Sequence, residues 1–195
     1  AGLGGPAVMD DALARAKQAA RTAALARRGA AHAADDGSGA ARLSAFLRAH
    51  RGVPLAGYLP IRSEIDPRPA MAEAARHGPV AVPVIDAPAA PLRFARWAPD
   101  TALAPGPFGV TVPVDPQWIV PEILIVPLLA FTAQGARLGY GGGFYDRTLQ
   151  ALRARGPVLA VGFAYGAQQA DTLPFDPNDQ PLDLLVTDRE ILSFS

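Results

Sequence analysis

The chain has 195 residues, half of them hydrophobic, and its 18 acidic and 18 basic side chains give a formal net charge of zero. The absence of cysteine excludes disulfides, thiolate nucleophiles and cysteine-based zinc sites. The balanced charge provides no global field for nucleic acid or an anionic membrane, and no apolar stretch reaches the roughly 20 residues of a membrane span. We therefore expect a cytoplasmic monomer with no nucleic-acid or membrane partner.

The N-terminus is expected to be a leader followed by a long helix. Residues 1–8 begin with a glycine-rich stretch that lacks the features of a signal peptide, and we predict them to be disordered, with Met9 as a candidate natural start. Residues 8–28 are rich in alanine and predict a helix that opens on aspartates and ends near Gly29. Residues 9–195 are expected to form one domain, since that length suits a single core.

Two basic side chains, Lys17 and Arg21, stand four residues apart on this helix and therefore share a face. On this evidence alone a solvated basic face is the favoured interpretation. The sharper hypothesis is that the pair binds a polyphosphate.

Short helices and strands alternate through the rest of the chain after a polar linker at 32–39. Strands are predicted at 52–59, 80–85, 92–97, 123–126, 157–165, 184–187 and 190–194, and helices at 40–50, 67–77 and 144–155. Residues 99–116 carry many prolines and glycines and are predicted to be extended and irregular. The alternation predicts an α/β fold: a single-domain layered sandwich with a parallel or mixed sheet flanked by helices.

Two acidic residues follow the first predicted strand. Asp66 precedes a proline and is explained as a helix N-cap. Glu64 is not explained in this way. Two interpretations of Glu64, an exposed glutamate in a loop and a ligand-binding residue, are about equally favoured. Tyr58, Glu64 and the glycine-rich turn described next all lie just after predicted strands, so we expect them to meet at one edge of the sheet.

A glycine-rich turn at 139–143 follows the apolar run at 123–126 and precedes the predicted helix at 144–155. Glycines allow backbone N–H groups to approach a ligand, and a helix N-terminus favours phosphate. The turn is not a Walker P-loop, because no Gly-Lys-Ser/Thr follows it. It is not the dinucleotide fingerprint either, because Phe144 stands where a small residue is required.

Asp146 lies in the first turn of that helix. A carboxylate beside bound phosphate would repel it unless a cation lay between them, and magnesium binds one or two carboxylates together with phosphate oxygens. Asp179 and Asp183 are both candidates for the second acid, and spacing alone does not choose between them.

Residues 137–147, Arg-Leu-Gly-Tyr-Gly-Gly-Gly-Phe-Tyr-Asp-Arg, closely resemble the signature of the 5-formyltetrahydrofolate cyclo-ligases, also called 5,10-methenyltetrahydrofolate synthetases. The resemblance extends over nearly the whole chain from Lys17. Its further parts are the Lys17 and Arg21 pair, segment 58–66, residues 108–113, and Asp179-x-Pro-x-Asp183 followed by Val186-Thr187. Two departures are visible: Phe144 stands where the family often has tyrosine, and Asn178 where histidine is common.

The resemblance implies a ligase of one-carbon metabolism. It would convert 5-formyltetrahydrofolate and ATP to 5,10-methenyltetrahydrofolate, ADP and phosphate, with Mg²⁺ as cofactor. In that chemistry ATP phosphorylates the formyl oxygen, folate N10 attacks the activated carbon, and phosphate leaves as the ring closes. Positioning and charge stabilisation would carry most of the catalysis.

The same resemblance implies roles for individual residues. Lys17, Arg137 and Tyr145 are expected to act in catalysis. The expected ATP-binding residues are Lys17, Arg21, Arg137, Leu138, Gly139, Tyr140, Gly141, Gly142, Gly143, Phe144, Tyr145 and Asp146. The expected folate-binding residues are Tyr58, Glu64, Trp97, Phe144 and Tyr145. Asp146 and Asp183 are expected to bind the metal, since family matching favours Asp183 over Asp179.

Two other functions remain open at the level of sequence. A folate- or nucleotide-binding module without catalysis would keep the glycines and aromatics but lose the charged residues of a phosphoryl-transfer site, which are present here. A small-molecule kinase would also use ATP but would release a stable phosphorylated product.

Overall fold

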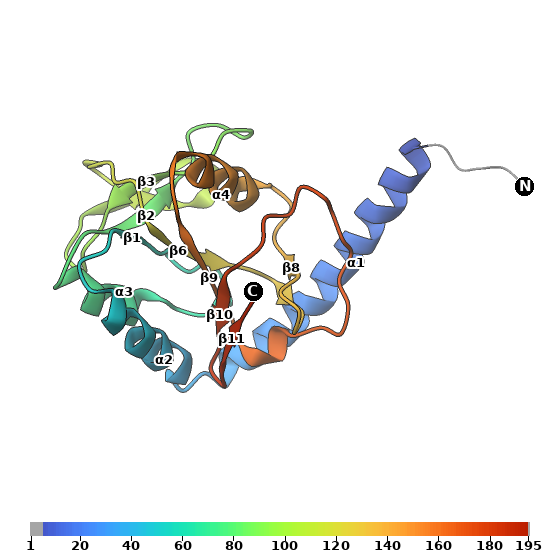
Figure 1. Cartoon of the computed structure of the whole chain (residues 1–195), viewed down its shortest axis with the longest axis horizontal. Coiled ribbons are helices and arrows are strands. Elements are labelled where there is room, and N and C mark those ends of the chain that lie inside the picture. The colour runs from blue at the N-terminus through green and yellow to red at the C-terminus, as the bar shows by residue number, and fades with distance from the viewer. Residues whose placement is uncertain (1–5, 195) are drawn as a thin grey trace, which may run out of the picture.

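A seven-stranded sheet forms the centre of the protein, as a computed structural model of residues 6–194 shows (Figure 1). Its strands are β1 (Leu55–Ala56), β2 (Val80–Val84), β3 (Arg93–Arg96), β6 (Ile123–Pro127), β9 (Leu159–Phe163), β10 (Leu184–Val186) and β11 (Ile191–Ser193). Their spatial order is β11-β10-β9-β6-β1-β2-β3. The five central strands are parallel, whereas β3 and β11 are antiparallel to their neighbours. The predicted α/β class with a mixed sheet is therefore confirmed.

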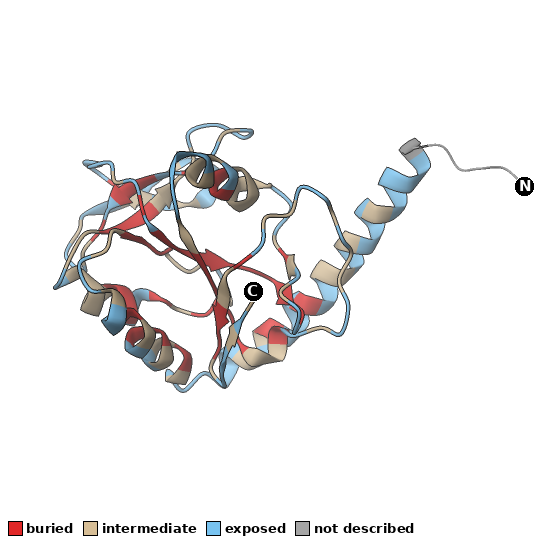
Figure 2. Ribbon diagram, in the orientation of Figure 1, coloured by how far each residue is buried: buried red, intermediate tan, exposed pale blue. Residues whose placement is uncertain are grey.

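Helices cover both faces of the sheet. The α-helices are α1 (Pro6–Ala33), α2 (Ser38–Leu47), α3 (Arg68–Ala75) and α4 (Phe144–Arg155), and the 3-10 helices are η1 (Arg48–His50), η2 (Pro107–Gly109) and η3 (Gly166–Gln168). α2 and α3 lie on one face and α4 on the other, so that the burial is concentrated along the strands between them (Figure 2). None of these helices has the length and apolar character needed to cross a membrane.

The apolar run of β6 is explained by burial on both faces. Ile123 and Ile125 pack into the core beneath α2 and α3, whereas Leu124 and Val126 pack into the core beneath α4. A parallel strand covered on both faces has no solvent side, and its sequence is therefore continuously hydrophobic. This strand directs the chain toward the edge of the sheet where the glycine turn lies.

Helix α1 is longer than predicted. It continues through Gly29 to Ala33, because one glycine costs only about 1 kcal/mol and the last turns make tertiary contacts. At its start, Pro6 to Val8 are helical rather than part of a disordered leader, and Asp10 therefore lies beyond the first turn. Residues 1–5 of the predicted leader lie outside the described residues. The N-terminal half of α1 extends away from the sheet (Figure 1).

Two further segments differ from the sequence prediction. The strand predicted at 52–59 is reduced to β1, because Pro54 cannot donate to a ladder and the chain leaves the sheet after Ala56. Residues 99–116, predicted to be irregular, contain a hairpin of β4 (Leu103–Pro105) and β5 (Thr111–Pro113).

A second small hairpin positions the glycine turn. It consists of β7 (Ala130–Phe131) and β8 (Arg137–Leu138), and β8 leads directly into residues 139–143. Ala24 of α1 is fully buried against Leu129 and Leu138 of this hairpin. The contact brings the basic residues of α1 beside the turn.

Candidate active site

A cavity of about 820 Å³ lies at the carboxyl ends of the central parallel strands. Its wall combines Lys17 and Arg21 of α1, Tyr58 and Glu64 after β1, and residues 137–147. The volume is within the range of about 300–1,000 Å³ that is common for small-molecule sites, and the carboxyl edge is where α/β sheets usually bind ligands. The prediction that these segments meet at one edge of the sheet is confirmed.

The glycine turn has the backbone of an anion-binding loop. Gly141 has φ +99° and Gly143 has φ +68°, which side-chain-bearing residues rarely adopt. Gly143 is the N-cap of α4 and provides no side-chain cap, so the first N–H groups of this 12-residue helix remain available to a ligand. The Gly139 carbonyl accepts a hydrogen bond of 2.9 Å from Arg21 Nε, which fixes the turn to α1.

The basic pair of α1 faces this turn instead of solvent. The Lys17 side chain is 15% exposed, and its Nζ lies 2.9 Å from an oxygen of Asp176 and 3.8 Å from one of Asp179. Arg21 is partly buried by its contact with Gly139. The solvated-face interpretation, favoured from sequence alone, is therefore wrong, and both cations lie at the cavity.

Asp146 lies at the cavity in contact with Arg137. The Arg137 guanidinium donates a hydrogen bond to Asp146 Oδ1, which also accepts the Gln180 N–H at 2.8 Å. Asp179 lines the same cavity. Burial and the nearby negative charge of Asp146 raise the pKa of Asp179 against the opposing effect of Lys17. Such clustering of negative charge is typical of a site that binds a cation.

The structure does not bring Asp183 to this cluster, which corrects the predicted metal pair. Asp183 Oδ2 accepts the Ala160 N–H at 2.7 Å and lies 3.6 Å from an Arg153 nitrogen. Its side chain therefore ties β9 to the end of the 171–183 loop. Among residues 6–194, no cluster of three histidine or acidic side chains could hold a metal without other ligands.

Glu64 is 5% exposed, so the exposed-loop interpretation is wrong. Its Oε1 accepts the Ile61 N–H at 2.8 Å. Burial raises the pKa of Glu64, while the Ile61 N–H, the Arg28 charge and the Tyr140 hydroxyl oppose the rise by stabilising the carboxylate. Two acceptor oxygens on a nearly dry wall suit a ligand with several hydrogen-bond donors.

Three tyrosines surround Glu64. The Tyr58 hydroxyl donates to the Ile65 carbonyl at 2.7 Å, which fixes its ring in the wall. Burial, with Glu64 as the largest charge effect, raises the pKa of both Tyr58 and Tyr145. It also raises the pKa of Tyr140 to about 12. All three phenols therefore stay neutral, and the hydroxyls of Tyr140 and Tyr145 can donate hydrogen bonds near the carboxylate.

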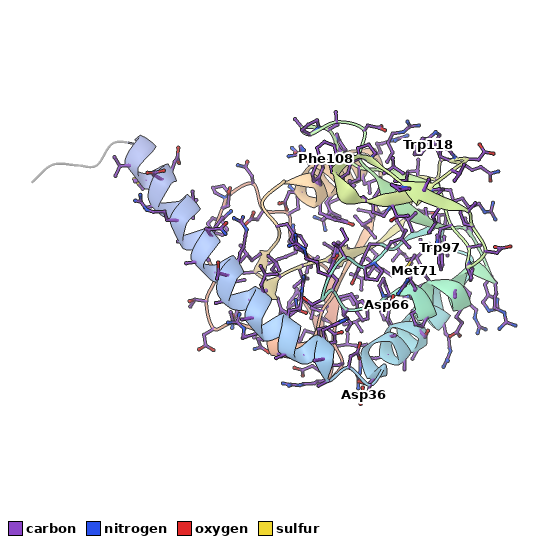
Figure 3. All side chains as sticks on the ribbon, turned by 180° about the vertical axis from the view of Figure 1, so that it is seen from behind. Asp36, Asp66, Met71, Trp97, Phe108 and Trp118 are labelled. Atoms are coloured by element: carbon purple, nitrogen blue, oxygen red, sulfur yellow. The ribbon has the colours of Figure 1, made fainter. Side chains whose placement is uncertain are left out.

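The structure does not place Trp97 at the cavity, which corrects its predicted role in folate binding. Trp97 is 6% exposed and belongs to the core that includes Met71 (Figure 3). Trp118 stacks on Arg93, with the guanidinium carbon 3.5 Å from the ring centroid. Phe108 instead lies edge-on to Phe144, at 6.5 Å between ring centroids.

Sequence reasoning missed two contributors to the site. Arg28 of α1 is 1% exposed and donates a hydrogen bond to the Tyr140 hydroxyl from behind the wall. Its position, seven residues after Arg21, is two helical turns further along the same face and is a signal that could have found it. Asp176, the partner of Lys17, comes from a polar loop that offers no periodic signal.

The fold and the site together define the class of protein. It is an α/β protein with a single-domain core, in which a glycine-rich turn at a helix N-terminus and a buried carboxylate open into one cavity. The model of the 5-formyltetrahydrofolate cyclo-ligase family matches residues 13–188, and the chain therefore belongs to that family. The prediction of an enzyme of this family is confirmed.

Individual relatives agree with this assignment. The chain is 45% identical to the 5-formyltetrahydrofolate cyclo-ligase of Haemophilus influenzae over 101 residues, which cover 49% of this chain and 54% of that protein. It is 34% identical to that of Escherichia coli K12 over 144 residues, which cover 70% of this chain and 79% of that protein. The NMR structure of Aquifex aeolicus 5,10-methenyltetrahydrofolate synthetase superposes with a TM-score of 0.71 at 26% identity, covering 91% of this chain and 92% of that one.

Proposed function

We propose that the protein converts 5-formyltetrahydrofolate to 5,10-methenyltetrahydrofolate, with ATP as co-substrate and Mg²⁺ as cofactor, and releases ADP and phosphate. One observation carries the proposal: a phosphate-binding set and a buried carboxylate face the same cavity. Lys17, Arg21 and the glycine turn form the first, and Glu64 is the second. Because both groups open into one space, two substrates bound there would be adjacent.

The ATP side of the cavity is the wall formed by α1 and the glycine turn. Backbone N–H groups at the start of α4 would bind phosphate oxygens, and Lys17 and Arg21 would neutralise them from α1. Arg137 is 6% exposed, and its Nε has no hydrogen-bond partner among residues 6–194. A buried guanidinium with a free donor is suited to stabilise negative charge on a transferring phosphoryl group.

The residues present fit the magnesium ion that the family implies. Asp146 and Asp179 are hard oxygen donors on the same cavity wall, and the charge of Asp146 already raises the pKa of Asp179. We infer that these two carboxylates hold the ion. When bound, magnesium would neutralise phosphate charge and orient the terminal phosphoryl group.

The folate side of the cavity is the wall around Glu64. A carboxylate accepts hydrogen bonds from the donor-bearing edge of a pterin ring, and its burial strengthens them by excluding water. Phe144 and Tyr145 provide aromatic surface at the start of α4, and Tyr58 closes the wall from β1. Both tyrosines remain neutral; Tyr145 can donate as well as stack, whereas the Tyr58 hydroxyl is engaged with the Ile65 carbonyl.

The chemistry follows from holding the two substrates in line. The formyl oxygen attacks the terminal phosphorus and ADP leaves; N10 then attacks the formyl carbon, loses its proton, and phosphate leaves with the former formyl oxygen. Arg137, Lys17 and the turn stabilise the negative charge that spreads over the phosphoryl group. The enclosing tyrosines keep water from the activated carbon, which would otherwise return to the formyl compound.

An absorbance assay tests the proposal. Mixing the protein with 5-formyltetrahydrofolate, ATP and magnesium should produce the near-ultraviolet absorbance of the methenyl product, and omission of ATP should prevent it. No change with all components present would refute the proposed reaction. Accumulation of a stable phosphorylated folate would indicate a kinase, and folate binding without ATP consumption would indicate a binding module. A cytoplasmic monomer without nucleic-acid or membrane partners stays a prediction.

A further inference from the structure

Arg28 is a buried cation that the proposed reaction does not use directly. It is 1% exposed and lies behind the cavity wall on α1. Removing a guanidinium from water is strongly unfavourable unless its donors and charge are compensated. Arg28 Nε donates to Ser63 Oγ at 3.0 Å and Nη1 donates to the Tyr140 hydroxyl, while Nη2 has no hydrogen-bond partner among residues 6–194. Its compensation therefore comes from two separate segments of the active site.

These two segments are the loop that carries Glu64 and the glycine turn that carries Tyr140. Ser63 is the residue immediately before Glu64, and Arg62 before it has φ +54°, a strained conformation for a residue other than glycine. Tyr140 lies inside the glycine turn, and its ring centroid is 5.5 Å from the Arg28 guanidinium carbon. Arg28 thus links α1, the strained Glu64 loop and the turn at one point.

Arg28 is also the cation whose charge acts on Glu64. The groups that face the carboxylate are Tyr58, Tyr140 and Tyr145, all neutral phenols, and Arg28 behind Tyr140. The Arg28 charge lowers the pKa of Glu64 against the larger effect of burial. Since the Tyr140 hydroxyl accepts from Arg28, its own proton is directed to another acceptor, and it stabilises the Glu64 carboxylate.

We propose that Arg28 is a positioning residue for the folate substrate, acting through Tyr140 and Ser63 to fix the Glu64 loop and to keep the Glu64 carboxylate anionic. It touches neither substrate, and the proposal rests on the proposed function only in taking folate as the ligand of Glu64. It also assigns the Tyr140 hydroxyl to the folate side, although Tyr140 was predicted from its motif as an ATP-binding residue.

The test compares Arg28→Met with Arg28→Lys and with Arg27→Met, a matched control because Arg27 is the exposed neighbour on the same helix. Arg28→Met should weaken folate binding about tenfold or more, the usual consequence of losing hydrogen bonds to a charged group. The KM for ATP should stay unchanged, and the acidic limb of the pH profile of kcat/KM for folate should move to higher pH. Arg28→Lys should lose less folate affinity and show a smaller shift of the pH profile than Arg28→Met. Arg27→Met should match the unmodified protein in both.

Tyr140→Phe tests the same link without removing the buried cation, and it keeps the ring of a half-exposed residue. It should shift folate affinity and the pH profile in the same direction as Arg28→Met. The proposal would be overturned if both variants lost affinity for folate and for ATP equally. It would also be overturned if their folate affinity and pH profile were the same as those of Arg27→Met. The role of Arg28 and the proposed reaction are tested separately. Absence of product in the absorbance assay of the unmodified protein would refute the reaction. Calorimetry with 5-formyltetrahydrofolate alone measures the folate affinity of each variant and still decides the role of Arg28.

Discussion

Arg137 donates a hydrogen bond to the same Asp146 oxygen that accepts the Gln180 N–H at 2.8 Å. The residue predicted to bind phosphate and the residue predicted to bind its cation are therefore in direct contact. Their mutual contact compensates a guanidinium that is only 6% exposed.

Asp146→Asn should lower turnover by about 100-fold or more, because an amide cannot neutralise a cation as a carboxylate does. Its carbonyl oxygen can still accept from Arg137 and Gln180, but it no longer compensates the charge of the buried Arg137, so the melting temperature should fall while the protein stays folded at the assay temperature. The measurement is the rate of product formation across a magnesium titration, together with a thermal melt. Full turnover in this variant would show that Asp146 does not bind the metal.

Asp179→Asn and Asp183→Asn distinguish the two candidates for the second metal ligand. Asp179 shares the cavity with Asp146, whereas Asp183 holds the Ala160 N–H. Asp179→Asn should raise the magnesium concentration needed for half-maximal rate by about tenfold. Asp183→Asn keeps an acceptor for Ala160 and should leave that requirement unchanged. The opposite pattern would restore Asp183 as the metal ligand.

The sequence was sufficient to predict the elements that lie on continuous motifs around the candidate site. The α4 helix begins at Phe144 and ends at Arg155 as predicted, because glycines on both sides limit it and apolar periodicity fills it. The glycine turn before α4 and the burial of β6 follow from equally local patterns. For the same reason the fold class could be predicted from the alternation of elements.

The errors concern residues whose position depends on tertiary packing. Asp179 and Asp183 are four residues apart in one loop, and only the path of that loop beside Lys17 shows which one reaches the cavity. Trp97 follows β3 and could face either side of the sheet, but its amide bonds to Val80 and its ring enters the core. Arg28 was overlooked because a basic residue near a helix end is usually solvated.

Lys17→Met should raise the KM for ATP about tenfold or more, since a charge-assisted contact to phosphate is lost. Arg15→Met is the matched control: Arg15 lies on the same helix, is 71% exposed and, within residues 6–194, forms an ion pair only with Asp11 four residues earlier. It should change the KM for ATP by less than about twofold, because exposed ion pairs contribute little. Steady-state kinetics at saturating folate measure both. Similar values for the two variants would remove Lys17 from the ATP site.

Gly141→Ala should impair ATP binding, and Gly29→Ala should not. Gly141 has φ +99°, and an added Cβ would lie 3.1 Å from an Arg21 guanidinium nitrogen, so alanine strains the turn and displaces Arg21. Gly29 lies within helix α1, with nothing within 4 Å of an added Cβ, and alanine there should stabilise the protein by about 0.5–1 kcal/mol. The KM for ATP should therefore rise in Gly141→Ala. In Gly29→Ala the KM for ATP should stay normal and the melting temperature should rise. Normal ATP binding by Gly141→Ala would contradict the role of the turn.

Glu64→Gln should separate stability from function. Burial is the main cause of the raised pKa of Glu64, so folding favours its protonated form. The favourable contribution is present below the usual pKa of a glutamate and is lost as the pH rises through the raised value. At neutral pH the ionised side chain therefore costs stability, and a neutral glutamine removes that cost.

We accordingly expect Glu64→Gln to melt at a higher temperature than the unmodified protein at about pH 7.5. At about pH 4, below the usual pKa of a glutamate, the two proteins should melt at similar temperatures. Folate affinity should fall about tenfold or more, because a glutamine cannot accept two charge-assisted hydrogen bonds. Glu73→Gln is the control of opposite sign: its hydrogen bond from Arg48 is the main cause of a lowered pKa, so the substitution should not raise the melting temperature at neutral pH. A Glu64→Gln variant less stable than the unmodified protein at neutral pH would mean that Arg28 compensates the carboxylate more than burial penalises it. If so, the carboxylate would be retained for the stability of the fold as well as for its ligand.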